Sequence, residues 1–163
     1  MALVISAVLT NSGRQALAQS FGGTTGGFSW SYAKYFKIGV ANYTGSEPNA
    51  PSVLATDIYS VASGAFYYRK SFIPADVLFI SPSTIQFRCF LDTGDANGNS
   101  FNEPDTASSA DGPKNSSTLA GNAPVFYELG IFDPQNVLIA YGTFPGEAKL
   151  NTKTLNHLVN INF

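Results

Sequence analysis

The chain has few charged residues. Only 12% of its 163 residues are Asp, Glu, Lys or Arg, and the formal net charge is −2, whereas a typical soluble domain has about 25% charged residues. The nine Lys and Arg residues are scattered and form no basic run, so the electrostatic footprint of a nucleic-acid-binding protein is missing. Sparse charge together with 13% aromatic residues predicts a surface that other subunits cover.

The chain also has few of the residues that bind metals or carry out catalysis. Its single cysteine, Cys89, excludes an internal disulfide and a cysteine zinc cage. His157 is the only histidine, and no Gly-x-Ser-x-Gly nucleophile motif is present. We therefore predict a protein that is not an enzyme and holds no cofactor. His157 is expected to be half-buried and hydrogen-bonded, and Cys89 to be a small buried hydrophobic residue.

The apolar N-terminus lacks the marks of a targeting or membrane segment. No positive charge precedes Arg14, and Ser6 interrupts the apolar run of residues 1–9. A signal peptide begins with positive charge, and a membrane-spanning helix needs about 20 apolar residues. We interpret this run as a β-strand, and we expect a soluble protein that is made in the cytosol and does not enter a membrane.

What the chain does contain is strand and turn chemistry. Phe (13), Tyr (8), Gly (15) and Pro (9) are abundant, and this mixture is typical of short strands joined by turns. The length fits a single domain that spans residues 1–163. The expected fold is all-β, a β-sandwich with one short N-terminal α-helix. Apolar and alternating patterns place its strands at 3–9, 28–40, 65–73, 77–80, 84–91, 125–133, 138–144 and 155–163.

The helix is predicted over residues 14–21. Ser12 precedes a glutamine by three residues, which is the spacing of a capping box at a helix N-terminus. Leu17 and Phe21 are four residues apart and are expected to face the core, with Ala18 beside them.

Residues 125–144 form the centre of the predicted fold, as two apolar strands joined by a tight turn. Strand 84–91 is its expected neighbour. Glu128 lies among phenylalanines on one of the two strands, and a carboxylate in such a place needs a partner. We expect that partner to be Arg69, Arg88 or the backbone of a turn.

A polar segment of 33 residues, 92–124, separates those strands and is predicted to be an extended surface loop. Its first part resembles a calcium loop, because Glu103 is the twelfth residue counted from Asp92. The glycine that such a loop needs at its sixth position is instead seventh, at Gly98, so a solvated Asn-Gly turn is the alternative interpretation. The candidate calcium ligands are Asp92, Asp95, Asn97, Asn99 and Glu103.

Aromatic residues of the predicted sheet are candidates for an interaction surface. Aromatic rings stack on sugar rings and also fill cores and protein interfaces. The candidates are Trp30, Tyr32, Tyr35, Tyr67 and Tyr68.

Several of these segments together resemble the bacteriophage tail-collar fibre family, the N-terminal, baseplate-proximal domain of many tail fibres. The run 9–18 (LTNSGRQALA) resembles that family's opening strand, Thr-x-x-Gly step and Leu/Ala helix. Lys37-Ile-Gly-Val40 matches its strand with a Gly-Val step. The most distinctive match is Glu128-Leu-Gly-Ile-Phe-Asp133, followed after a turn by the apolar strand 137–140. The chain departs from the family in two features, namely the insertion at 92–124 and an end at Phe163 without a shaft or receptor-binding tip.

The resemblance implies a bacteriophage virion structural protein of the tail or baseplate, which acts as a tail-fibre attachment or adaptor component. It also implies a homo-oligomer, especially a trimer, with other tail and baseplate proteins as partners and the virion as its location. Two alternatives stay open. One is a carbohydrate- or receptor-binding β-sandwich module, and the other is a capsid decoration or head-fibre protein.

Overall fold

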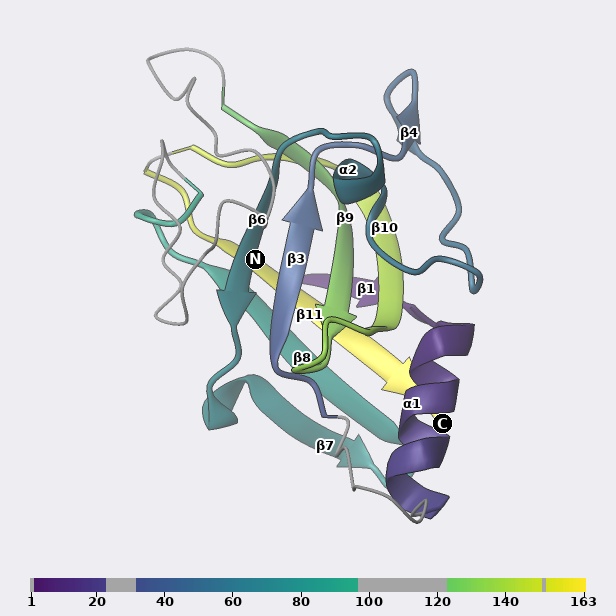
Figure 1. Cartoon of the computed structure of the whole chain (residues 1–163). Helices are drawn as coiled ribbons and strands as arrows, with labels where there is room; N and C mark the ends of the chain where they lie inside the picture. Colours follow the sequence, from purple (N-terminus) through teal and green to yellow (C-terminus); the bar gives the residue numbers. More distant parts are fainter. Residues whose placement is uncertain (1, 23–31, 97–122, 151) are drawn as a thin grey trace.

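A computed structural model describes residues 2–22, 32–96, 123–150 and 152–163 of the chain (Figure 1). Two β-sheets lie one behind the other with their strands crossing obliquely, and helix α1 lies at one end beside the C-terminus. The all-β fold with one short N-terminal helix is therefore confirmed, and a second helix of a single turn is added. The helices are α1 (Asn11–Gly22), α2 (Tyr59–Ala62) and the 3-10 turn η1 (Pro74–Asp76).

The first sheet has four strands in the order β1-β11-β8-β7. Here β11 pairs in parallel with β1 and antiparallel with β8, and β7 is an edge strand that pairs antiparallel with β8. The strands are β1 (Leu3–Ser6), β7 (Val77–Ser81), β8 (Thr84–Leu91) and β11 (Leu155–Asn162).

The second sheet has five strands in the order β2-β10-β9-β3-β6, and a separate pair, β4 and β5, forms a small hairpin. Ala7 divides the predicted N-terminal strand, so that β1 belongs to the first sheet and β2 to the second. The strands are β2 (Val8–Leu9), β3 (Tyr35–Gly39), β4 (Tyr43–Thr44), β5 (Glu47–Pro48), β6 (Tyr67–Ser71), β9 (Val125–Phe132) and β10 (Leu138–Ala148).

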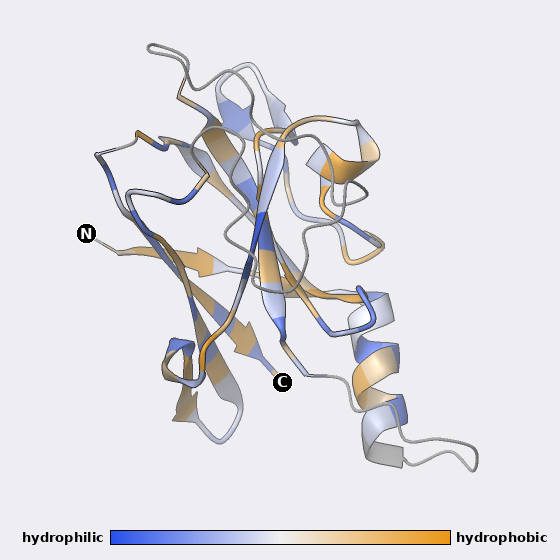
Figure 2. Ribbon diagram, turned by 60° about the vertical axis from the view of Figure 1, so that its left-hand side comes forward, coloured by the Kyte–Doolittle hydropathy of each residue, from blue (hydrophilic) through white to orange (hydrophobic). Residues whose placement is uncertain are grey.

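The main core lies between the two sheets, and a second, smaller core lies on the outer face of the second sheet. Alternate residues of β8 and β11 point inward, as their sequence pattern predicts. Figure 2 shows apolar stretches in the strands of both layers. The main core includes Ile5, Phe36, Ile38, Phe87, Cys89, Leu91, Phe126, Ile131, Phe144, Leu155, Val159 and Ile161, and the second contains Tyr35, Ile58, Tyr67, Phe132, Leu138 and Tyr141.

The predicted central hairpin is confirmed as β9 and β10, but the prediction that strand 84–91 lies beside it is wrong. β9 pairs with β10 on one side and with β3 on the other. The strand predicted at 84–91 is β8, and it lies in the opposite sheet between β11 and β7. The chain thus crosses from one layer to the other between Leu91 and Val125, and local sequence patterns do not specify in which sheet a strand lies.

Helix α1 begins earlier than predicted, and its cap is a different residue. The side-chain oxygen of Thr10 accepts a hydrogen bond from the backbone N–H of Gly13 at 3.0 Å, so Thr10 and not Ser12 is the N-cap. The backbone N–H of Thr10 donates to the carbonyl of Ile139 at 2.9 Å, which fixes the start of the helix to β10. Leu17 packs against the main core as predicted, whereas Ala18 is exposed.

Within the described ranges, neither α1 nor any other helix has the length and apolar character needed to cross a membrane.

Candidate functional site

The candidate calcium residues are only partly within the described chain. Asn97, Asn99 and Glu103 lie outside the described residues. Asp95 is buried, and its carboxylate accepts hydrogen bonds from Lys70, from the Tyr68 hydroxyl at 3.2 Å and from the backbone N–H of Asp92 at 2.8 Å. The described residues contain no group of three or more His, Cys, Asp or Glu side chains that could hold a metal ion. The calcium site remains a sequence-based prediction.

The aromatic candidates separate into buried and exposed residues. Tyr35, Tyr67 and Tyr68 are buried inside the chain, which corrects the expectation that they form an interaction surface. The segment that carries α2 covers Tyr35 and Tyr67, and Tyr68 faces the main core. Tyr32 is exposed, and Trp30 lies outside the described residues.

His157 is fully buried and therefore more enclosed than the sequence predicts. Its Nε2 atom lies 3.1 Å from the carboxylate of Glu147, which also accepts a hydrogen bond from Lys153 at 2.9 Å. The Phe144 ring packs beside the imidazole of His157, with 4.6 Å between the two ring centroids. Burial lowers the pKa of His157, and the charge of Glu147 opposes that effect. Nearby, a shallow cavity of about 410 Å³ is lined in part by Glu147, Lys153 and Thr154.

Glu128 is also fully buried. Of the three partners expected for it, the backbone of a turn is the one that its carboxylate contacts. Its carboxylate accepts the backbone N–H groups of Tyr59 and Ser60, at 2.8 and 2.7 Å, at the start of α2. It also accepts the hydroxyl of Tyr141 at 2.5 Å. Burial raises the pKa of Glu128, and these hydrogen bonds partly oppose the rise. The network therefore anchors α2 to the central hairpin.

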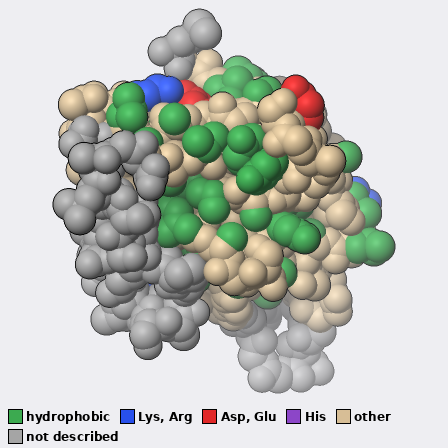
Figure 3. Space-filling view, turned by 90° about the horizontal axis from the view of Figure 1, so that it is seen from above, with side chains coloured by type: hydrophobic (Ala, Val, Ile, Leu, Met, Phe, Trp, Pro, Cys, Tyr) green, Lys and Arg blue, Asp and Glu red, His purple; other side chains and the backbone are tan. Residues whose placement is uncertain are grey.

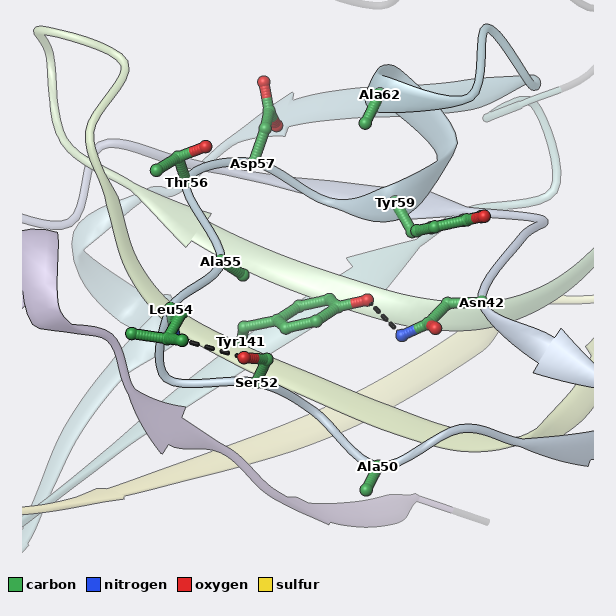
Figure 4. A pocket seen from close by; sticks show the side chains of 10 residues that line it. All are labelled: Asn42, Ala50, Ser52, Leu54, Ala55, Thr56, Asp57, Tyr59, Ala62 and Tyr141. Atoms are coloured by element: carbon green, nitrogen blue, oxygen red, sulfur yellow. Dashed lines mark hydrogen bonds between the residues drawn. The ribbon is translucent and has the colours of Figure 1, made fainter.

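Above this network lies a cavity of about 300 Å³, shown in Figure 4. Tyr141 lies in the middle, with its hydroxyl pointing toward Asn42, whose amide donates to it at 2.5 Å. Tyr59 lies on one side of the cavity and Ser52 on the other. Asp57, on the rim, is paired with Lys37, whose ammonium lies 3.1 Å from both carboxylate oxygens. The cavity is therefore close to neutral and carries amide and hydroxyl groups beside apolar ones.

The surface around this cavity is apolar. Figure 3 looks down on this end of the molecule and shows hydrophobic side chains gathered across it, with charged groups toward the edge. Leu54 and Tyr59, which line the cavity, are exposed. A surface of this kind suits contact with an uncharged ligand or partner.

The most exposed apolar region of the described chain is the edge strand β7 with its surroundings. Leu78, Phe79 and Ile80 are 50%, 77% and 56% exposed, and nearby Ile73 and Phe163 are 60% and 62% exposed. We call these five residues the β7 surface. Phe163 belongs to it because its backbone N–H donates to the carbonyl of Ser83, at 2.9 Å, in the turn that follows β7.

Both faces of β7 contribute to this surface. Phe79 lies opposite Ile85 of β8, on the face toward the core, and Leu78 lies opposite Gln86 on the other face. Figure 1 shows β7 at the lower border of its sheet. Val77 packs partly against the main core, whereas Leu78 on one face and Phe79 on the other are both exposed.

Comparison with known proteins found no matching family model, no matching curated protein and no matching solved structure.

The apolar pattern of residues 77–80 predicts the strand β7 but does not predict its exposure. Residues 77–83 carry no charge, and an apolar strand without charge normally predicts a fully buried strand. The available signal was Pro82, directly after the strand ends at Ser81, because proline is confined to turns and to the edges of sheets.

Proposed function

We propose that this protein is a non-enzymatic bacteriophage virion structural protein of the tail or baseplate. In this role it acts as a tail-fibre attachment or adaptor component through protein–protein assembly. The observation that carries the proposal is the β7 surface, because a large apolar patch on an edge strand marks a site that another protein covers.

Two further features support an assembly role. The chain is poor in charge and rich in aromatic residues, as is typical of the buried part of protein interfaces. The resemblance of residues 9–18, 37–40, 128–133 and 137–140 to the tail-collar fibre family supports a role in the tail.

The proposal is tested by locating the protein in purified phage particles. Particles are separated into tails and heads, and each fraction is analysed by quantitative mass spectrometry with antibody labelling in the electron microscope. The protein is expected in the tail fraction, in fixed stoichiometry with a baseplate or fibre protein. Recovery only with heads supports a decoration or head-fibre role instead, and absence from all particles contradicts the proposal.

A second candidate function, binding of a sugar, is favoured by the cavity beside Tyr141. An exposed tyrosine, Tyr59, and the hydroxyl of Ser52 lie on opposite sides of Tyr141, and the amide of Asn42 lies beside the Tyr141 hydroxyl. An aromatic ring together with amide and hydroxyl groups suits a neutral sugar ring, which has one apolar face and several hydroxyls. A glycan array with the wild type and with Tyr59→Ala is the test. Specific binding that Tyr59→Ala removes and Tyr43→Ala retains would establish this function.

A further inference from the structure

We infer that β7 pairs antiparallel with β7 of a second copy of this chain across a two-fold axis, which joins two four-stranded sheets into one eight-stranded sheet. The inference rests on the proposed assembly function and names the partner at the same surface.

The backbone of β7 is open to such a partner. Residues 78–81 of the described chain have no backbone hydrogen bonds beyond their pairing with β8. An edge strand presents a row of unpaired N–H and C=O groups, and proteins that stay monomeric protect such edges with charges, prolines or cover. Between Val77 and Ser81 there is neither a charge nor a proline.

The pairing register follows from a bulge. The pairing of β7 with β8 is irregular between Phe79 and Ser81, so the regular part of the strand is Val77–Phe79. An antiparallel copy matches this part when Leu78 lies on the two-fold axis. Leu78 then faces its own copy, and Val77 of each chain faces Phe79 of the other. Pairs of a β-branched and an aromatic residue are among the favourable cross-strand pairs.

Charge favours the antiparallel arrangement over a parallel one. Asp76 is the only charged residue between Ile73 and Ser83. With Leu78 on the axis, the two copies of Asp76 are four residues apart along the strand, or about 14 Å. That exceeds the screening length of about 10 Å at 0.1 M salt. A parallel, in-register pair would place the two carboxylates side by side, where like charges are destabilising.

The β7 surface offers apolar area for a dimer to bury. An aromatic side chain offers roughly 150–250 Å², so Phe79 and Phe163, at 77% and 62% exposure, together expose roughly 200–350 Å². The three aliphatic residues of the β7 surface, each at least half exposed, add to this. A two-fold axis uses the same patch on both copies, so pairing covers this apolar area twice.

A cysteine scan tests the pairing, because the native Cys89 is fully buried and contributes little background. Residues that face each other across antiparallel strands have Cα atoms about 4.5–5.5 Å apart, within the usual disulfide range of about 4.4–6.8 Å. Leu78→Cys is expected to form a covalent dimer on mild oxidation. Val77→Cys and Phe79→Cys should each stay uncrosslinked alone and crosslink when mixed.

The control is Leu54→Cys, which is 74% exposed and lies outside the β7 surface, and it should remain uncrosslinked. Crosslinking confined to Phe79→Cys or Ile80→Cys still supports antiparallel pairing, with a shifted axis. Equal crosslinking at Val77, Leu78 and Phe79 indicates parallel pairing or random collision and overturns the inference. So does the absence of crosslinking at every position of β7.

Sedimentation of the full chain gives an independent test. The wild type is expected to be a dimer at micromolar concentrations and Leu78→Lys a folded monomer, while Leu54→Lys remains dimeric. A wild type that is monomeric, or a trimer that Leu78→Lys does not dissociate, overturns the inference. A dimer that is never found in particles contradicts the proposed function alone, whereas monomeric protein recovered from particles contradicts this inference alone.

Discussion

The hydroxyl of Tyr141 donates a hydrogen bond of 2.5 Å to the carboxylate of Glu128, inside the hairpin that β9 and β10 form. Both side chains are buried. The carboxylate raises the pKa of Tyr141 further, beyond the effect of burial, because a negative charge beside a phenol disfavours its ionisation. Tyr141 is therefore a hydrogen-bond donor here, and the pair links the hairpin to α2 through Tyr59 and Ser60.

Replacing Glu128 with alanine is expected to destabilise the protein by about 2–4 kcal/mol, because two backbone N–H groups and one hydroxyl lose a buried acceptor. Glu128→Gln should cost less, since one carbonyl oxygen remains. Urea unfolding measures both. Glu47→Ala, at an exposed position of β5, is the control and should change stability by less than about 0.5 kcal/mol. An equally small effect of Glu128→Ala would contradict the anchoring role.

The stability of the protein is expected to fall as the pH decreases below about 6.5, because of His157. Burial lowers its pKa in the folded state, with Phe144, Glu147 and Lys153 around the ring. Below the unfolded pKa the unfolded chain binds a proton more readily than the folded chain does, and this favours unfolding. The slope from one such group is at most about 1.4 kcal/mol per pH unit.

The matched variant is His157→Gln, whose unfolding free energy is compared with that of the wild type between pH 5 and pH 8. Since His157 is the only histidine, the difference between the two proteins should vary with pH below about 6.5 and be constant above it. A difference that stays constant throughout would show that His157 does not titrate differently on folding.

Lys37→Met is expected to lower the free energy of unfolding by about 2 kcal/mol. Lys37 is buried, and its removal leaves the carboxylate of Asp57 without its cationic partner, although the backbone N–H of Ile58 still donates to it. The loss is smaller than the roughly 3–5 kcal/mol typical of a fully buried pair, because Asp57 is 23% exposed. Thermal or urea unfolding of the single variants and of Lys37→Met with Asp57→Asn forms a double-mutant cycle. A coupling energy near zero would refute a stabilising ion pair.

Thr10→Ala is expected to destabilise the protein by about 1–2 kcal/mol, as is usual when a helix loses its N-cap. Ser12→Ala, two residues along, should change stability by less than about 0.5 kcal/mol, because the Ser12 side chain does not cap the helix. Helicity by circular dichroism and urea unfolding of the two variants decide between the caps. A larger effect of Ser12→Ala would restore the capping box that the sequence predicts.

Much of the fold was determined by the sequence itself, because alternation and turn chemistry are local. The inward residues of β8 and β11, the hairpin of β9 and β10, and the burial of Cys89 follow from side-chain spacing along the chain. That partners cover part of the surface stays a prediction from the low charge.

Other features were decided only by the tertiary structure, because they depend on contacts between distant segments. The sequence assigned β8 to the hairpin, but the chain changes layers between Leu91 and Val125. Tyr35 and Tyr67 are buried because the α2 segment folds over the second sheet. β7 is an apolar strand, yet Leu78, Phe79 and Ile80 are exposed, because local patterns do not specify which apolar strand lies at an edge.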